Sequence, residues 1–396
     1  MGTMKTERLF DQDVRRTEFE GKVLERRADK NAVILERTCF YPESGGQLPD
    51  IGTLNSIPVT DVQEEGEAIL HFLDGALPEG TVQGRVDWEV RFDHMQQHTG
   101  QHLLSGAFDQ LARAMTVGFH MSAEYCTIDL RIPSLASELA DRVEDLANRV
   151  VFEDRPVKVL LLNREEALRL PLRKRPPDLE ALRVLEIVDF DYSACGGTHC
   201  QRTGEVGLVK IASWEKIRED VRVEFLCGGR ALRDYRWRNH TINRMAGELS
   251  IAPRDLEPSF RRLRQENADK GKRIKELLEE SLKYEAESLV KEAEASGSFR
   301  LVIKVFPDRD PEEVRELANR VAEHPGTVAL LAATGDKANL VFVRSPDLSQ
   351  DMNLLMNEAV SRIGGRGGGR PNFAQGGGPL VPDLPALLHE LGKGIR

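Results

Sequence analysis

The sequence lacks the features that mark secreted and membrane proteins. Only five of its 396 residues are cysteine, an odd number scattered along the chain. No apolar run approaches the roughly 20 residues needed to cross a bilayer, and no secretory signal is recognisable. Scattered thiols without a secretory segment favour reduced cysteines over a disulfide framework. We therefore expect a cytoplasmic protein without a membrane-spanning segment.

The chain also lacks an overall excess of basic residues. Its 65 acidic residues outnumber its 55 Lys and Arg residues, which gives a formal net charge of −10. Contact with nucleic acid nevertheless needs only a local basic surface. Two basic clusters are present, Arg169, Arg173, Lys174 and Arg175 in one, and Arg230, Arg233, Arg236 and Arg238 with Tyr235 and Trp237 in the other. A solvated helix face explains either cluster equally well.

The length and the ordinary composition, 40% hydrophobic and 30% charged, allow two or three domains with their own cores. We expect an α+β protein with four segments. Closely spaced short strands in residues 1–90 predict a small β-barrel, and mixed elements in 91–240 predict an α+β domain. The highly charged residues 241–297 predict a helical linker, either a hairpin or a short coiled-coil arm, which is a candidate dimer contact. Residues 298–396 form an α/β unit that contains a glycine-rich run.

Hydrophobic periodicity predicts several elements within these segments. A long helix is expected over 91–115 and an amphipathic one over Ala136–Phe152. A turn at Gly228–Leu232 is expected to close the second segment. The remaining expected elements are strands at Tyr125–Leu130, Val221–Phe225, Val328–Ala333 and Asn339–Arg344, and a helix at Met352–Ile363.

Histidine and cysteine occur in a pattern that suits a metal. His94, His98 and His102 recur every four residues, so all three share one helix face and spacing alone does not choose a pair. Nearly a hundred residues later comes Cys195-Gly-Gly-Thr-His199, whose glycines permit a turn sharp enough for a thiolate and an imidazole to converge. Imidazoles with one thiolate are borderline-soft donors, which zinc prefers.

Two glycine-rich stretches have competing interpretations. Ser44-Gly45-Gly46-Gln47 is either a hairpin turn or a place where the backbone approaches a ligand closely, with the Gln47 amide available to it. The run from Gly364 to Pro371 is either a flexible linker or an anion-binding segment in which Arg366 and Arg370 add charge.

These motifs together resemble a known family. HTGQHLL (98–104), SACGGTHCQRTGEVG (193–207) and FYPESGGQ (40–47) are similar to the editing region shared by alanyl-tRNA synthetases and the free-standing alanyl-tRNA editing proteins of the AlaX family. The C-terminal segment resembles the glycine-rich, tRNA-binding domain of alanyl-tRNA synthetase, which also occurs in DHH phosphoesterases. The whole chain therefore looks like the long form of AlaX.

The resemblance implies a zinc-dependent deacylase that hydrolyses, in trans, serine or glycine wrongly esterified to tRNA(Ala). It implies four zinc ligands: His98, His102, Cys195 and His199. The implied substrate-binding residues are Gly45, Gly46, Gln47, Gln101 and Thr198, of which Thr198 and Gln101 are also candidates to act beside a zinc-associated water. Gln101 departs from the threonine common at that place in synthetases. The implied tRNA-binding residues are Arg173, Lys174, Arg175, Arg366 and Arg370.

Alternatives to this hypothesis stay open on sequence alone. Four protein ligands would fill the tetrahedral coordination sphere of a zinc ion and leave no position for water or substrate. Either the ion takes a fifth ligand, or one protein ligand dissociates, or the zinc only organises the pocket. A non-catalytic, zinc-containing tRNA-binding protein is the second candidate. A DHH-type phosphoesterase fits poorly, because Asp93-His94-Met95 is a weak imitation of its metal-binding signature. No module for ATP-dependent activation is recognisable, so we expect no aminoacylation.

Overall fold

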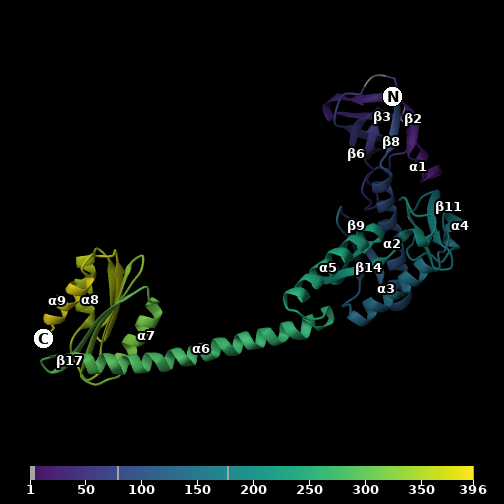
Figure 1. Ribbon diagram of the computed structural model, residues 1–396. Helices are drawn as coiled ribbons and strands as arrows, with labels where there is room; N and C mark the ends of the chain where they lie inside the picture. Colours follow the sequence, from purple (N-terminus) through teal and green to yellow (C-terminus); the bar gives the residue numbers. More distant parts are fainter. Residues whose placement is uncertain (1–4, 78–79, 176–177, 396) are drawn as a thin grey trace. The chain divides into compact units, whose positions relative to one another are not determined.

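The computed structural model describes residues 5–77, 80–175 and 178–395 (Figure 1). The chain forms two compact units, Met1–Ser250 and Ile251–Arg396. Both units contain helices and strands, which agrees with the α+β class expected from the sequence. Within the described ranges, no helix combines the length and apolar character that crossing a membrane requires.

The first unit begins with a small closed barrel. Its strands follow one another around the ring in the order β2-β3-β7-β6-β5-β8. Alternate residues point inward, as in β8, where Val82 and Val86 are buried between exposed neighbours. The bounds are β2 Glu18–Arg27, β3 Ala32–Leu35, β5 Gly52–Leu54, β6 Ile57–Glu65, β7 Ala68–Leu73 and β8 Thr81–Val86, preceded by β1 Glu7–Arg8 and α1 Leu9–Gln12 and interrupted by β4 Arg37–Thr38.

Helix α2 (Trp88–Ala112) is the central element of the rest of this unit. The Asp87 side chain caps its N-terminus by accepting hydrogen bonds from the N–H groups of Glu89 and Val90. Nearly every residue from 94 to 108 is buried, and a Cβ on Gly100 would lie 2.1 Å from Cys227 Sγ. The helix is therefore packed on several sides, so the side chains that it carries are held in place.

The rest of the first unit contains two sheets and the helices α3, α4 and α5, of which α3 and α5 contact α2. One sheet has the order β14-β15-β10-β9 and the other the order β11-β12-β13. Helix α3 packs against α2 and shares its hydrophobic core. The bounds are β9 Met115–Met121, β10 Cys126–Arg131, α3 Ser137–Phe152, β11 Val157–Asn163, α4 Arg164–Leu168, β12 Ala181–Ile187, β13 Asp191–Ala194, β14 Val209–Ile217, β15 Asp220–Cys227 and α5 Gly228–Glu248.

A fully buried ion pair ties the barrel to α2. Arg91 and Asp50 both have side chains with no solvent exposure. Arg91 Nε donates to Asp50 Oδ1 at 2.9 Å, and its terminal nitrogens donate to the backbone oxygens of Val14 and Cys39. Asp50 Oδ2 also accepts from the N–H of Tyr41 at 2.6 Å. The glycine-rich segment at 44–47 is thereby held in a fixed position relative to α2.

Replacing Asp50 by asparagine is expected to destabilise the first unit strongly. The Arg91 guanidinium would remain buried without a counter-charge, which typically costs roughly 3–5 kcal/mol. Denaturant unfolding followed by tryptophan fluorescence measures the change. Asp141→Asn, an exposed site on α3, should shift the free energy of unfolding by less than about 0.5 kcal/mol. Equal stability of the two variants would contradict a structural role for the pair.

The second unit is a sheet with helices on both faces. Its strand order is β16-β17-β18-β19-β21-β20, with β17 and β18 parallel. Neighbouring residues Leu330 and Leu331 of β18 belong to different cores, one with α8 and α9 and one with α7 and the end of α6. The bounds are α6 Leu256–Glu292, β16 Glu294–Ser296, β17 Phe299–Pro307, α7 Pro311–Ala322, β18 Thr327–Thr334, β19 Ala338–Arg344, α8 Met352–Ile363, β20 Arg366–Arg370, β21 Phe373–Gly378 and α9 Leu384–Lys393.

The structure corrects one expectation about glycine and shows the form of the second glycine-rich run. Gly228–Leu232 is not a turn but the first turn of α5, with only Gly228 in a left-handed conformation (φ +52°). Residues 366–378, which include most of the glycine-rich run, form the edge hairpin β20–β21, and binding of an anion there stays a prediction. A Cβ on Gly376 would lie 2.6 Å from Val360 Cγ1 and 2.8 Å from Met356 Sδ. This glycine therefore allows α8 to pack closely on the sheet.

Other expectations agree with the structure. The predicted helix at 352–363 coincides with α8, and the two predicted strands before it are the antiparallel pair β18 and β19. Most of the charged linker is helical, in the end of α5 and in α6. The boundary drawn at residue 240 falls inside α5. All five cysteines are free thiols.

Candidate metal centre

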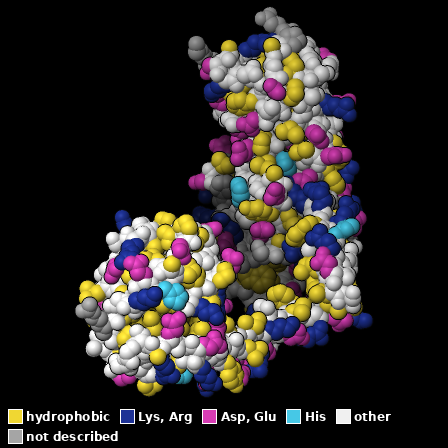
Figure 2. All heavy atoms as spheres, turned by 60° about the vertical axis from the view of Figure 1, so that its left-hand side comes forward, with side chains coloured by type: hydrophobic (Ala, Val, Ile, Leu, Met, Phe, Trp, Pro, Cys, Tyr) yellow, Lys and Arg dark blue, Asp and Glu magenta, His cyan; other side chains and the backbone are white. Residues whose placement is uncertain are grey.

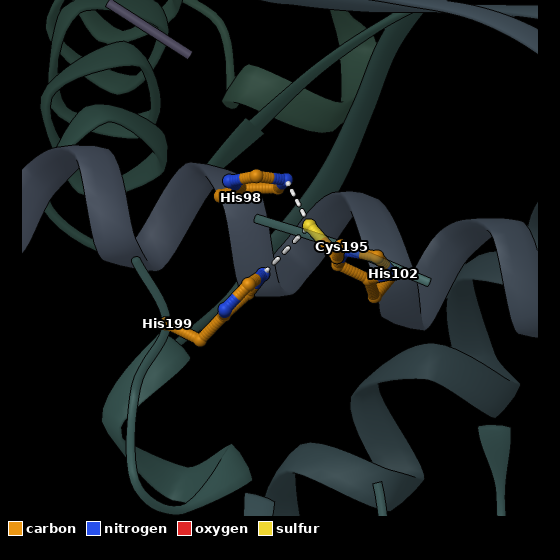
Figure 3. A group of neighbouring side chains, drawn as sticks. All are labelled: His98, His102, Cys195 and His199. Atoms are coloured by element: carbon orange, nitrogen blue, oxygen red, sulfur yellow. Dashed lines mark hydrogen bonds between the residues drawn. The ribbon is translucent and has the colours of Figure 1, made fainter. Parts of the chain in front are cut away.

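Two distant segments bring four donor side chains together (Figure 3). Helix α2 presents His98 and His102 from successive turns, with ring centroids 5.2 Å apart. The loop after β13 presents Cys195 and His199 to the same point. Cys195 Sγ lies 3.3 Å from His98 Nε2 and 3.4 Å from His199 Nε2, and the ligand atoms of all four residues lie within 4.8 Å of one another.

This cluster fits a metal better than it fits a set of hydrogen bonds. A nitrogen and a sulfur ligand of a tetrahedral zinc stand about 3.5 Å apart, close to the two distances observed. His102 Nε2 is buried and has no hydrogen-bond partner among the residues that the structure describes. Burial, the largest cause, holds the pKa of His98, His102 and His199 well below the usual value, so the rings are neutral and able to coordinate.

Gly197 and Arg183 shape the loop that carries Cys195 and His199. A Cβ on Gly197 would lie 2.1 Å from His98 Cε1, so only glycine allows the loop to pass this ring. Arg183 Nη1 donates to the backbone oxygens of Cys195 and Gly197 at 3.0 and 2.7 Å. These contacts with His98 and Arg183 therefore hold the loop in place.

Gln47 has a role that the sequence does not indicate. Its Oε1 accepts from His98 Nδ1 at 2.8 Å and from the N–H of Thr198 at 3.0 Å, while its Nε2 donates to Thr198 Oγ1 at 2.8 Å. An amide oxygen only accepts, so His98 carries its proton on Nδ1 and turns the lone pair of Nε2 toward Cys195. Gln47 thus positions His98 and anchors the loop.

A second polar group lies behind His102. Asp191 is buried and forms an ion pair with Arg173, which also donates to Ser193 Oγ at 2.6 Å. His102 Nδ1 lies 3.4 Å from Arg173 Nη2 and 3.9 Å from Asp191 Oδ2. Buried carboxylates beside a metal-binding histidine commonly fix its orientation. Sequence reasoning missed Asp191 and Arg183, because isolated polar residues in strands leave no periodic signal.

A cavity of about 310 Å³ is lined by three of the four donors, His98, His102 and Cys195. Its size is at the low end for small-molecule sites. Polar groups from α2 and basic groups from the 173–175 segment face it together with the backbone of β9. The residues that line it are Gly45, His98, Gln101, His102, Thr116, Val117, Gly118, Phe119, Arg173, Lys174, Arg175, Ser193, Ala194 and Cys195.

The predicted substrate residues divide into two groups. Gly45 and Gln101 line the cavity, and Gln101 Nε2 donates to Ser105 Oγ at 2.8 Å. Gln47 and Thr198 are buried and hydrogen-bonded to each other behind His98. The Gly46 backbone oxygen accepts from the N–H of Met121, and a Cβ on Gly46 would lie 2.6 Å from Phe119 O. Contact of all five residues with substrate stays a prediction.

The predicted tRNA-binding residues are also separated. Arg173 is held by Asp191, whereas Lys174 and Arg175 are exposed at the cavity. Arg366 and Arg370 lie at the ends of β20 in the second unit, and both are exposed. His94 is buried on α2 and does not belong to the four-donor group found among the described residues.

Affinity for zinc is expected to rise with pH. Burial raises the pKa of the Cys195 thiol, so this group must lose a proton when a cation binds, while the neutral imidazoles need lose none. One proton released per ion gives about a tenfold gain in affinity per pH unit below the thiol pKa. Competition with a chelator between about pH 6.5 and 8 measures the slope. An affinity independent of pH would show that Cys195 does not bind as a thiolate.

Three family models match the chain. They are the tRNA synthetases class II (A) family over residues 5–90, the threonyl and alanyl tRNA synthetase second additional domain over 182–223, and the DHHA1 domain over 298–395. The second match contains Cys195 and His199. These matches place the chain in the class of proteins related to tRNA synthetases, with a domain of the threonyl and alanyl enzymes at the donor cluster and a DHHA1 domain after it.

Similar proteins define the family more narrowly. The alanyl-tRNA editing protein AlaX-L of Pyrococcus horikoshii is 31% identical over 387 residues, which cover 93% of this chain and 94% of that protein. The chain belongs to the AlaX-L family of alanyl-tRNA editing proteins. An alanine–tRNA ligase of Natronomonas pharaonis is 34% identical over 97% of this chain, which spans only 43% of the ligase. The solved C-Ala domain of Aquifex aeolicus alanyl-tRNA synthetase is 32% identical over 26% of this chain and 98% of its own, with a TM-score of 0.24.

Proposed function

We propose that the chain is a trans-editing deacylase that hydrolyses the ester of serine, and secondarily of glycine, wrongly attached to tRNA(Ala). The observation that carries this proposal is the convergence of four metal-binding atoms, three of them on residues that line a cavity large enough for an aminoacyl group. Zinc is the proposed cofactor, held by His98, His102, Cys195 and His199. The family relationship supplies the identity of the tRNA.

Hydrolysis of an aminoacyl ester requires mainly that the protein positions the reacting groups. An aminoacyl ester is already activated, so the site must orient a water and stabilise negative charge on the carbonyl oxygen. Bound zinc supplies a Lewis acid for this purpose. Gln47 keeps the His98 proton on Nδ1, Arg183 holds the loop of Cys195, and the Arg173–Asp191 pair holds His102. These residues therefore position the donors, and we assign none of them a proton-transfer step.

Selection of serine requires a polar partner in the cavity. A synthetase site sized for alanine rejects serine poorly, so a second site must bind the hydroxyl group of serine favourably. Gln101 is the best placed of the predicted residues, because its amide lines the cavity and is oriented by Ser105, which also accepts a hydrogen bond from Thr116. Its Oε1 takes part in no hydrogen bond within the described part of the chain and is available to a serine hydroxyl. Thr198 then supports the site through Gln47.

Basic residues at the cavity suit the 3′ end of a tRNA. Lys174 and Arg175 carry no ion pair among the described residues and lie where the terminal phosphates would pass. We assign Arg366 and Arg370 of the second unit to the tRNA backbone as well. Figure 2 shows basic and acidic side chains interspersed over the visible surface, so contact with RNA depends on such local groups.

The domain roles and the oligomer follow from the same proposal. The barrel (1–90) and the zinc-bearing domain (91–240) form the editing module, the helical linker (241–297) connects it to the tRNA-binding unit (298–396), and the linker is a candidate dimer contact. Exposed apolar side chains on α6 support the dimer, since Phe260 and Ile274 are 59% and 66% exposed at heptad-compatible positions.

Deacylation of Ser-, Gly- and Ala-tRNA(Ala) by the full chain tests the function. Single-turnover hydrolysis should be fast for the serine ester, slower for glycine and slowest for alanine. A chelator should abolish it, and added zinc should restore it. The alternative, a non-catalytic tRNA-binding protein with structural zinc, predicts binding without hydrolysis and unfolding when the metal is removed. Binding of tRNA with no hydrolysis of any ester would overturn the proposal.

A further inference from the structure

Helix α5 carries a basic stripe on one exposed face, outside the cavity. The stripe consists of Arg233, Arg236, Trp237, His240 and Arg244, whose spacings of three, four, seven and eleven residues from the first put them on one side of the helix. All five are exposed, Trp237 to 64%. The stripe extends about 16 Å along the helix axis.

Few carboxylates of the described residues pair with the arginines of this stripe. Within the described ranges, Arg236 and Arg244 have no ion-pair partner, and Arg233 only reaches Asp93 at 4.0 Å. Elsewhere on the surface, arginines such as Arg261 and Arg362 are paired with glutamate four residues away. Helix α5 holds five arginines against two acids, Asp234 and Glu248, in a chain whose net charge is −10. A solvated face stabilised by pairs would not concentrate unpaired cations in this way.

The stripe is also rigidly connected to the metal centre. Arg230, in the first turn of α5, is buried and pairs with Asp93 of α2, Nη2 to Oδ2 at 2.6 Å, and its Nη1 donates to the backbone oxygen of Ser122. Gln96 of α2 accepts from the N–H of Gly229. These contacts lie on α2 within two turns of His98. A ligand bound along the stripe is therefore held at a fixed distance from the cavity.

We propose that this stripe is a second RNA-binding surface, which grips the phosphate backbone of the tRNA while its 3′ end occupies the cavity. The proposal rests on the proposed function for the identity of the RNA. Three arginines spaced along the helix match a run of phosphates on one strand, and the guanidinium group suits phosphate oxygens. Trp237, exposed among them, lies against a ribose or an unpaired base, as aromatic side chains do in RNA complexes.

Binding of uncharged tRNA(Ala) to the full chain tests the surface. The triple variant Arg233→Gln/Arg236→Gln/Arg244→Gln should bind roughly tenfold to a hundredfold more weakly near 0.15 M salt, and the slope of log K against log salt should fall by roughly 2–3 for three lost phosphate contacts. Trp237→Ala should weaken binding and leave the salt slope unchanged, because stacking releases no counterions. Fluorescence anisotropy over a salt series measures both quantities.

A matched variant controls for loss of charge. Arg85→Gln/Arg131→Gln/Arg164→Gln removes three exposed arginines from the same unit, each of which has a carboxylate partner: Glu18, Asp220 and Asp178. It should bind tRNA like the parent protein. Equal loss in the two triple variants would mean that only bulk charge matters, and unchanged binding in the stripe variant would also overturn the proposal.

The outcomes for the surface and for the proposed function are separable. A short aminoacylated oligonucleotide that ends in the tRNA 3′ sequence reaches the cavity but not the stripe, so the stripe variant should hydrolyse it at the parent rate. If the parent protein hydrolyses no ester but the stripe variant binds RNA more weakly, the RNA-binding surface is supported and the proposed deacylase function is contradicted. If the stripe variant instead changes only the oligomeric state, the face binds a second copy and the RNA proposal fails.

Discussion

Replacing Cys195 by alanine is expected to remove the metal and to lower single-turnover deacylation of seryl-tRNA(Ala) by at least roughly 100- to 1,000-fold, the loss that follows removal of one transition-state-stabilising donor. Cys195 Sγ is the donor that lies within 3.4 Å of both His98 Nε2 and His199 Nε2. Without the thiolate, three neutral imidazoles remain, and they bind zinc more weakly because no anionic ligand balances the charge of the ion.

Cys200→Ala is the matched control for this prediction. Cys200 is a buried thiol five residues further along the same loop, but it lies outside the four-donor group. The control should retain about one zinc per chain and most of the activity, as measured by elemental analysis and quenched-flow hydrolysis. A Cys195→Ala variant that keeps both its metal and its rate would show that the cysteine is not a ligand.

The second large effect is expected from Gly197→Ala. The added methyl group would lie 2.1 Å from His98 Cε1, 2.3 Å from its Nδ1 and 2.9 Å from Gln47 Oε1. The ring or the loop must move, because the hydrogen bond to Gln47 and the backbone of α2 hold His98 in place. Displacement of His98 and loss of its hydrogen bond to Gln47 should each weaken zinc binding. Changes around metal ligands typically lower the metal affinity by about 10- to 100-fold.

The neighbouring glycine provides the comparison. A Cβ on Gly196 meets no atom within 4 Å, so Gly196→Ala should leave zinc affinity and deacylation near the parent values. Isothermal titration of the metal-free variants with zinc measures the difference. If the two alanine variants bound zinc equally well, the close approach of the loop to His98 would not be needed for the site.

Several helices and strands could be predicted from local pattern alone. The helix at 352–363 has clear apolar periodicity and an Asp351 N-cap, and the structure gives it the same bounds. The helix expected at 91–115 is α2, shifted by three residues at each end. The start of α5 was missed, because Gly228-Gly229 has the composition of a turn while Arg230 pairs with Asp93 more than 130 residues earlier.

The candidate site shows what local sequence pattern cannot predict. Spacing alone leaves His94, His98 and His102 equivalent, and only the family resemblance favours the last two. The structure groups His98 and His102 with Cys195 and His199 and leaves His94 outside. The contacts that hold the donors join residues up to 151 positions apart, such as Gln47 and Thr198. No periodicity within a single segment carries that information.

Gln47 illustrates how a motif and its role can differ. The glycines beside it suggested a backbone that approaches a ligand, and Gly45 does line the cavity. Gln47 itself is fully buried, and each end of its amide is used inside the protein. The chemical reason is that a neutral amide can fix both a histidine tautomer and a loop at once. Sequence alone could not distinguish these two uses.

X-ray absorption at the zinc edge tests the central claim most directly, because it reports the atoms bound to the ion in the intact protein. The arrangement of His98, His102, Cys195 and His199 predicts one zinc per chain, with three nitrogen ligands at about 2.0 Å and one sulfur ligand at about 2.3 Å. A stoichiometric zinc whose first shell contains no sulfur, or a protein that binds no zinc at all, would contradict it.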